Sequence, residues 1–117
     1  MTEILILLND PPYGTERSYN GLRMALALAR AEPEVRVQVF LMADAVLCAK
    51  AGQQTPKGYY NLERMLRGAL RHGEVLACGS CMDARGLTDA DLLEGAQRSS
   101  MDELARRTLD ASKVLVF

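Results

Sequence analysis

The 117-residue chain contains no tryptophan and a single histidine, and aromatic residues make up only 5% of it. Few aromatic side chains are therefore available to stack on nucleic-acid bases. The formal net charge is −1, from 14 basic and 15 acidic residues. Proteins that bind nucleic acid or anionic membranes usually carry a clear positive excess, which is missing here. We therefore expect neither nucleic acid nor a membrane as a partner.

Long hydrophobic runs are also missing, since no apolar segment approaches the about 20 residues that a membrane-spanning helix needs. The opening segment Met1–Ile4 holds an acidic residue and no basic one, which is not typical of a signal peptide. The three cysteines are an odd number and do not suit a framework of disulfides. These features predict a cytoplasmic protein with free thiols.

Hydrophobic residues make up 49% of the chain, enough for a core. Short apolar or alternating segments, typical of strands, occur at residues 4–8, 35–42, 74–77, 96–99 and 114–117. Segments with helical spacing of apolar residues lie between them. This alternation predicts right-handed βαβ units. The expected fold is a three-layer α/β/α sandwich in one domain spanning residues 1–117.

Several residues are expected to mark helix ends. Thr15 and Asp44 are placed to cap the helices that follow them. Gly73 is expected as the first residue beyond the helix that starts near Leu62. Ser100 and Glu103 match the spacing of a capping box, in which each side chain bonds the other residue's amide.

Two cysteines, Cys78 and Cys81, lie in a turn directly after the apolar run Val75–Ala77. Ligands and reactive groups of parallel α/β sheets gather at the carboxyl ends of the strands. A helical turn there would favour a thiolate, which is the reactive form of cysteine. Cys78 is therefore the first candidate for sulfur chemistry. The alternative is a small buried side chain, because free cysteine packs like a hydrophobic residue.

Cys81 is the second candidate, placed to resolve a disulfide or persulfide on Cys78. It can equally face the core of the turn. Cys48 lies among Val46, Leu47 and Ala49 and is expected in the core.

Other residues near the turn are candidates for binding. Asp83 and Arg85 can orient a thiolate or bind an anionic group, or they can form a surface salt bridge of little energetic value. Gly86 is expected to adopt a left-handed backbone at the end of the turn. Tyr13 follows the first strand and should stand at the same sheet edge, where it either lines a shared pocket or packs against the start of the helix.

No metal or cofactor is predicted. A structural zinc ion needs about four ligands, whereas Cys78, Cys81 and His72 supply three. The chain has neither a G-x-G-x-x-G nor a G-K-[ST] motif, so dinucleotide or nucleoside triphosphate binding has no support.

Four segments together resemble the DsrE/DsrF-like family, and most of all its small, single-domain, homo-oligomeric YchN-like branch. They are Ile4–Leu8 with Pro12–Gly14, Phe40–Val46, the cysteine turn Cys78–Gly86, and Asp110–Phe117. The cysteine turn followed by Arg-Gly is the most specific of them. The resemblance spans essentially the whole chain.

This resemblance implies a mainly parallel five-stranded sheet and assembly into homo-trimers or hexamers, which the apolar carboxyl terminus also favours. It further implies a sulfur carrier or sulfurtransferase-like role, in which Cys78 holds persulfide sulfur between a donor and an acceptor protein. Two alternatives stay open at this point. One is a non-enzymatic oligomeric binding or regulatory module, and the other is a dithiol redox protein built on Cys78 and Cys81.

Overall fold

The five strands of the computed structural model, which describes residues 2–117, form one parallel sheet in the order β4-β3-β2-β1-β5. The strands are β1 (Thr2–Leu8), β2 (Val35–Leu41), β3 (Val75–Cys78), β4 (Gln97–Ser99) and β5 (Lys113–Val116). The helices in this range are α1 (Arg17–Ala31), α2 (Leu62–Ala69), α3 (Gly79–Asp83) and α4 (Met101–Asp110), with 3₁₀ segments η1 (Ala43–Ala49) and η2 (Asp89–Asp91).

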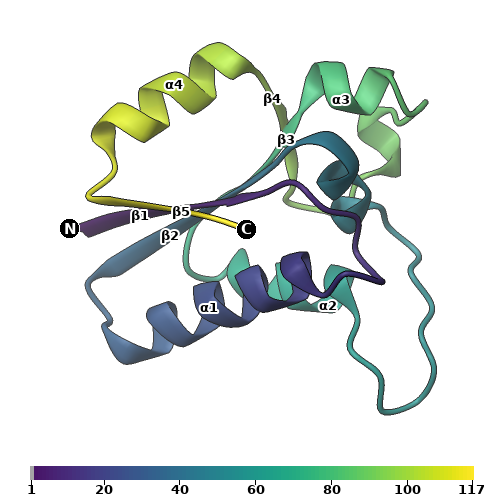
Figure 1. Cartoon of the computed structure of the whole chain (residues 1–117), viewed down its shortest axis with the longest axis horizontal. Coiled ribbons are helices and arrows are strands. Elements are labelled where there is room, and N and C mark those ends of the chain that lie inside the picture. Colours follow the sequence, from purple (N-terminus) through teal and green to yellow (C-terminus); the bar gives the residue numbers. More distant parts are fainter. Residues whose placement is uncertain (1) are drawn as a thin grey trace.

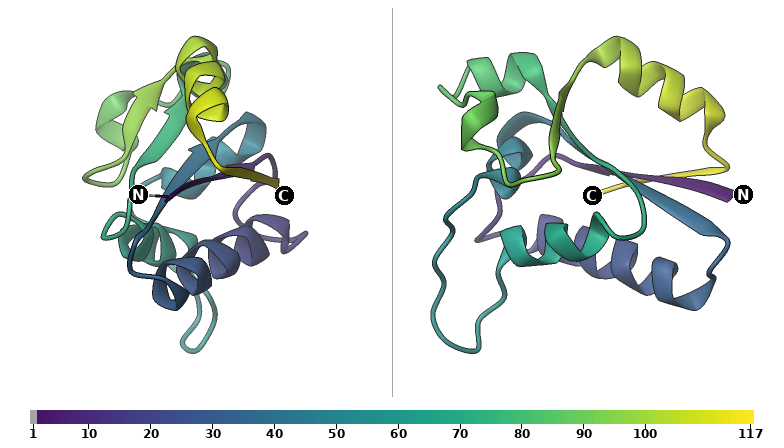
Figure 2. Two further views of the ribbon diagram at one scale, coloured as in Figure 1. Left: turned by 90° about the vertical axis from the view of Figure 1, so that its left-hand side faces the viewer. Right: turned by 180° about the vertical axis from the view of Figure 1, so that it is seen from behind.

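Helices α1 and α2 cover one face of the sheet, and α3 and α4 lie on the other (Figure 1). The views from the side and from behind show the same three layers (Figure 2). The predicted α/β sandwich with a parallel five-stranded sheet is therefore confirmed. Among residues 2–117, no helix has the length and apolarity needed to cross a bilayer.

The central strands are apolar on both faces, because helices cover both sides of the sheet. Phe40, Leu5 and Ile6 are each at most 1% exposed. Burial of one such side chain stabilises the fold by about 1.5–3 kcal/mol. The parallel register, with Ile4 beside Val37 and Phe40 beside Leu76, brings the carboxyl ends of the strands to one edge of the sheet.

The structure corrects the predicted start of the first helix. Residue Glu16, rather than Thr15, is the cap of α1 and has a left-handed backbone with φ 66°. The Thr15 hydroxyl accepts a hydrogen bond from the amide of Arg17 at 3.3 Å and donates one to Asp10 at 2.8 Å. Thr15 thus bonds the first turn from one position further out than predicted.

The segment after β2 also differs from the prediction. It is a 3₁₀ helix that already begins at Ala43, and Asp44 lies inside its first turn instead of capping it. Ala43 has φ 51°, a left-handed conformation that is unusual for a residue with a Cβ atom. The left-handed backbone of Ala43 turns the chain sharply at the carboxyl end of β2, towards the cysteine turn.

Gly73 does not end a helix as predicted, since α2 stops at Ala69 with Leu70 as its cap. The glycine is required for close packing instead. A Cβ atom at Gly73 would lie 1.8 Å from the carbonyl oxygen of Val37, which is far inside contact distance. The amides of Val37 and Val39 donate to the carbonyls of His72 and Glu74, so the chain already runs close alongside β2 at Gly73, before β3 begins.

The predicted capping box of the last helix is half formed. The Ser100 hydroxyl accepts from the amide of Glu103 at 3.2 Å, as expected. The carboxylate of Glu103 accepts instead from the hydroxyl of Ser99, at 2.6 Å, and from Arg107.

Candidate functional site

Cys78 is the last residue of β3 and the residue that caps α3. All four residues of β3 are buried, so this strand is fixed in the centre of the fold. The side chain of Cys78 is 5% exposed. The sequence thus places one thiol at the carboxyl edge of the sheet, at the point where a buried strand becomes a helical turn.

The surroundings of Cys78 favour its thiolate. The Ser80 hydroxyl lies 3.3 Å from the Cys78 sulfur. Burial opposes ionisation, but the Ser80 hydroxyl, the Cys81 thiol and the amides of both residues together lower the pKa of Cys78 below that of an ordinary thiol. The two side-chain donors lower the pKa of Cys78 more than the two amides do, and the sulfur makes no regular helix-capping hydrogen bond. Cys78 is therefore the more easily ionised of the two neighbouring cysteines.

Cys81 lies one helical turn further on and is partly exposed. The amide of Ala43 donates a hydrogen bond to its sulfur, with a distance of 3.2 Å between nitrogen and sulfur. Burial and the hydrogen bond to Cys78 raise the pKa of the Cys81 thiol, against the opposing effect of the Ala43 amide. The two cysteines thus lie on one helical turn and differ in acidity, with the pKa of Cys78 lowered and that of Cys81 raised.

Arg85 fixes the backbone of Cys81 rather than contacting Cys78. Its Nε donates to the Asp44 carboxylate at 2.8 Å, and its Nη1 donates to the carbonyl oxygen of Cys81 at 3.0 Å. Its positive charge lowers the pKa of Cys81 slightly. Arg85 therefore connects η1 to α3 and holds Ala43 and Cys81 in contact.

Asp83 points to a different arginine, Arg98 of β4, which the sequence analysis did not single out. The two side chains form a bidentate pair with distances of 3.0 and 2.8 Å, and this pair lowers the pKa of Asp83. The guanidinium also lies over Gly79, within the electrostatic field of Cys78. The sequence alone does not show that Arg98 lies near Gly79. The two residues come together because β4 pairs with β3, which places Arg98 beside Ala77.

Gly86 ends the cysteine turn with φ 69°, as predicted. The amide of Leu87 donates back to the carbonyl of Met82 at 2.9 Å, and that of Gly86 donates to Asp83 at 3.2 Å. This is the pattern of a Schellman motif, which needs a left-handed residue at its end. Gly86 therefore shapes the turn, and its contribution is conformational.

Tyr13 lies in a different group of contacts. Its hydroxyl donates to Gln53 at 2.5 Å and accepts from the amide of Leu62 at 3.2 Å. Its ring packs against Tyr59 and Tyr60, with centroids 6.5 and 5.6 Å away. The tyrosine thus anchors the loop between η1 and α2, and its hydroxyl is engaged there and not with the thiols.

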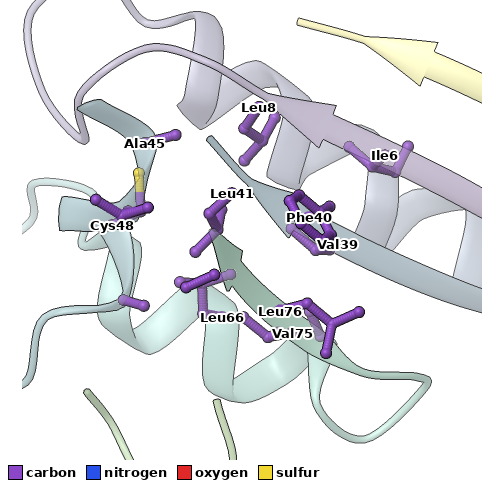
Figure 3. Packing of buried hydrophobic residues seen from close by; sticks show 14 of the residues in the cluster. Ile6, Leu8, Val39, Phe40, Leu41, Ala45, Cys48, Leu66, Val75 and Leu76 are labelled. Carbon is purple, nitrogen blue, oxygen red and sulfur yellow. The ribbon is translucent and has the colours of Figure 1, made fainter. Parts of the chain in front are cut away.

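Cys48 is fully buried, as predicted, and lies in the cluster that contains Ala45, Leu41 and Leu66 (Figure 3). Burial raises the pKa of its thiol to about 12, against the smaller lowering effect of the Ser18 hydroxyl. Cys48 is therefore a core residue. Within residues 2–117, no three His, Cys, Asp or Glu side chains gather in a group that could hold a metal ion.

The site thus combines two thiols, a hydroxyl, main-chain amides and two bound arginines at the carboxyl edge of a parallel sheet. The sequence model of the DsrE/DsrF-like family matches residues 2–117. The chain belongs to the DsrE/DsrF-like family. The resemblance seen in the cysteine turn is therefore confirmed over nearly the whole sequence.

Relatives within this family align over nearly their full lengths. Protein YchN of Escherichia coli (strain K12) is 39% identical over 118 residues, covering 100% of both chains. The protein MK0008 of Methanopyrus kandleri is 37% identical, covering 97% of this chain and 93% of its own. The protein MJ0989 of Methanocaldococcus jannaschii is 36% identical, covering 96% of both.

Solved structures agree with this assignment. The crystal structure of YchN from E. coli superposes with a TM-score of 0.94 and covers 100% of both chains. The structure of MTH1491 from Methanobacterium thermoautotrophicum superposes over both full chains with a TM-score of 0.79 at 18% identity. The second likeness shows the shared fold alone. This chain therefore has the fold of the DsrE/DsrF-like family.

Proposed function

We propose that this protein is a sulfur carrier in which Cys78 holds sulfur as a persulfide. The observation that carries the proposal is the environment of the Cys78 sulfur, which lies at a buried strand end next to the Ser80 hydroxyl and the Cys81 thiol. A thiol that ionises readily is needed to attack a sulfur donor. Membership of the DsrE/DsrF-like family adds support for a role in sulfur relay.

The loading step exchanges one sulfur–sulfur bond for another. The Cys78 thiolate attacks the outer sulfur of a donor persulfide, R–S–SH, and a bond forms between that sulfur and Cys78. The bond inside the donor breaks, and the donor leaves as the thiolate R–S⁻. The product is Cys78–S–SH, with no net oxidation. Unloading repeats the exchange, with an acceptor thiolate as the attacking group.

The test is the intact mass of the protein under non-reducing conditions after incubation with inorganic polysulfide. We expect a gain of sulfur that maps to Cys78 and is removed by a reductant. A matched Cys78→Ser variant should keep its fold and take up no sulfur. Loading of that variant to the wild-type level would contradict the proposal. An unchanged mass, with Cys78 open to alkylation, would favour a binding or regulatory module instead.

A dithiol redox protein is the second candidate, and the position of the two thiols on one helical turn favours it. In that case an oxidant removes two hydrogens and links Cys78 to Cys81. The same mass experiment separates the candidates, since a disulfide lowers the mass and a persulfide raises it.

We further propose that the protein acts in the reducing cytoplasm as a homo-oligomer, a trimer or a hexamer. Large apolar side chains left exposed near the carboxyl terminus support assembly. Leu109 is 87% exposed, and Met101, Val114 and Val116 are also exposed. Light scattering coupled to size-exclusion chromatography measures the mass directly, and a monomer at micromolar concentration would contradict this prediction.

A further inference from the structure

The two thiols of the site differ in how a second protein can reach them. Cys78 is 5% exposed, whereas Cys81 is only partly buried. An attacking thiolate must approach the sulfur–sulfur bond from a defined side, so burial of the carrying residue hinders transfer to a large acceptor. A small sulfur donor can therefore load Cys78 more readily than a large acceptor protein can unload it.

Cys81 is held in place by a second segment of the chain. The Ala43 amide donates to its sulfur at 3.2 Å, although the two residues are 38 positions apart in the sequence. Ala43 adopts a left-handed backbone, with φ 51°, which is unfavourable for a residue with a Cβ atom. Arg85 fixes the contact, because it binds Asp44 and the carbonyl of Cys81 together. An unfavourable backbone conformation at Ala43 therefore directs its amide to the Cys81 sulfur.

We propose that sulfur bound to Cys78 moves within the same chain to Cys81, and that Cys81, oriented by the Ala43 amide, is the thiol from which an acceptor takes it. This inference rests on the proposed function, since it needs a persulfide on Cys78. It gives Cys81 a carrying role, and it gives Ala43 and Arg85 a positioning role.

The transfer balances without an oxidant or a reductant. Cys81 first gives its proton to the outer sulfur of the ionised persulfide Cys78–S–S⁻. The Cys81 thiolate then attacks that sulfur, a bond forms between it and Cys81, and its bond to Cys78 breaks. The products are Cys81–S–SH and the Cys78 thiolate, so three sulfurs, one proton and one negative charge appear on each side.

The electrostatics of the site favour this direction. The leaving group is the Cys78 thiolate, whose pKa is lowered by the Ser80 hydroxyl and Cys81 against the opposing effect of burial. A leaving thiol of lower pKa departs faster. The same surroundings that help Cys78 to attack a donor therefore help it to release sulfur to Cys81.

The experiment follows one sulfur between the two residues. Wild-type protein is loaded with less than one equivalent of inorganic polysulfide, freed of excess reagent, and alkylated after increasing times. Trypsin cleaves after Arg71 and Arg85, so one peptide, residues 72–85, contains both cysteines. Fragmentation of that peptide between Gly79 and Ser80 assigns the sulfur. We expect it first on Cys78 and later on Cys81, with a rate independent of protein concentration.

Two variants test the roles. Cys81→Ser should still take up sulfur on Cys78 but should pass it to a protein thiol, that of reduced thioredoxin, about tenfold more slowly than the wild type. Arg85→Met, which frees the Cys81 carbonyl and Asp44, should lower the share of sulfur found on Cys81 several-fold.

Sulfur that stays on Cys78 in the loaded wild type, or wild-type release from Cys81→Ser, overturns this inference and leaves the proposed function standing. A protein that takes up no sulfur on Cys78 overturns both. A transfer rate that rises with protein concentration would mean exchange between chains, which also overturns transfer within one chain.

Discussion

The guanidinium of Arg98 occupies the space that a side chain on Gly79 would need. A Cβ atom at Gly79 would lie 2.8 Å from the Nε of Arg98. Arg98 is held in this position by its bidentate pair with Asp83. The first residue of α3 is therefore a glycine because an arginine from the neighbouring strand lies over the start of the helix, close to Cys78.

Replacement of Gly79 by alanine should displace Arg98 and leave the fold intact, because the end of an arginine side chain can move. We expect the pKa of Cys78 to rise and its alkylation at neutral pH to slow several-fold, since a nearby positive charge favours the thiolate. Mass-spectrometric alkylation kinetics measure this. Gly68→Ala in α2 is the matched control, since its nearest neighbour is the flexible side chain of Leu26. Alkylation of Gly79→Ala at the wild-type rate would contradict a role for Arg98.

The hydroxyl of Ser80 should control how the reactivity of Cys78 depends on pH. Burial raises the pKa of Cys78, but the hydroxyl of Ser80, followed by the other hydrogen-bond donors, lowers it overall. Its alkylation rate should therefore level off at a lower pH than that of free cysteine, and fall as the pH drops through this lowered pKa. Ser80→Ala should move the profile to higher pH and slow the reaction several-fold at pH 7. Ser80→Thr keeps a hydroxyl and is the control. Identical profiles for Ser80→Ala and wild type would exclude this hydroxyl as a cause.

Cys48 should remain unreactive until the protein unfolds. It is fully buried, and burial raises its pKa to about 12, so almost no thiolate exists at neutral pH. In a urea titration, alkylation of Cys48 should follow the loss of circular dichroism, while Cys78 reacts without denaturant. Labelling of native Cys48 at the rate of Cys78 would mean that the core around Ala45 opens locally.

The sequence pattern predicted the fold well because the strands are locally encoded. Ile4–Leu8 is apolar on both faces, and such a run is compatible with few positions other than the centre of a parallel sheet. The position of Cys78 followed from the same reasoning, since it directly succeeds a buried run. Gly86 was also predicted, because a left-handed residue is a local requirement of the turn.

The remaining features depend on contacts between distant segments. Arg98 reaches Gly79 only because β4 pairs with β3, and a strand of three residues carries little local signal. The Ala43 amide reaches Cys81 through a left-handed backbone at a residue that rarely adopts one. Gly73 was expected to end a helix, whereas its real constraint is the backbone of Val37. Local sequence patterns do not encode these contacts between distant segments.

Glu63 should stabilise the loop that precedes α2. Its buried carboxylate accepts hydrogen bonds from the amides of Gly52 and Gln53, at 3.0 and 2.9 Å, and pairs with Arg67. Glu63→Ala leaves both amides without this acceptor, and we expect the free energy of unfolding to fall by about 2–3 kcal/mol. Glu63→Gln keeps an acceptor oxygen, so its free energy of unfolding should fall by less.

Arg67→Met removes only an exposed partner and should lower the free energy of unfolding by no more than about 0.5 kcal/mol. Urea denaturation distinguishes the three, and equal stabilities of Glu63→Ala and Arg67→Met would contradict this role.

Gly73 should be among the positions most sensitive to substitution. A Cβ atom there would lie 1.8 Å from the carbonyl oxygen and 2.6 Å from the carbonyl carbon of Val37, and this backbone belongs to a central strand. A backbone obstacle cannot rotate away as the arginine at Gly79 can, so the strands must separate. We expect Gly73→Ala to lower the free energy of unfolding by about 3 kcal/mol or more, as overpacking in a core does. The same change at Gly68, within a helix, should be neutral or stabilising by up to about 1 kcal/mol. If thermal unfolding gives Gly73→Ala the same stability as Gly68→Ala, then residues 72–74 lie less tightly against β2 than this packing requires.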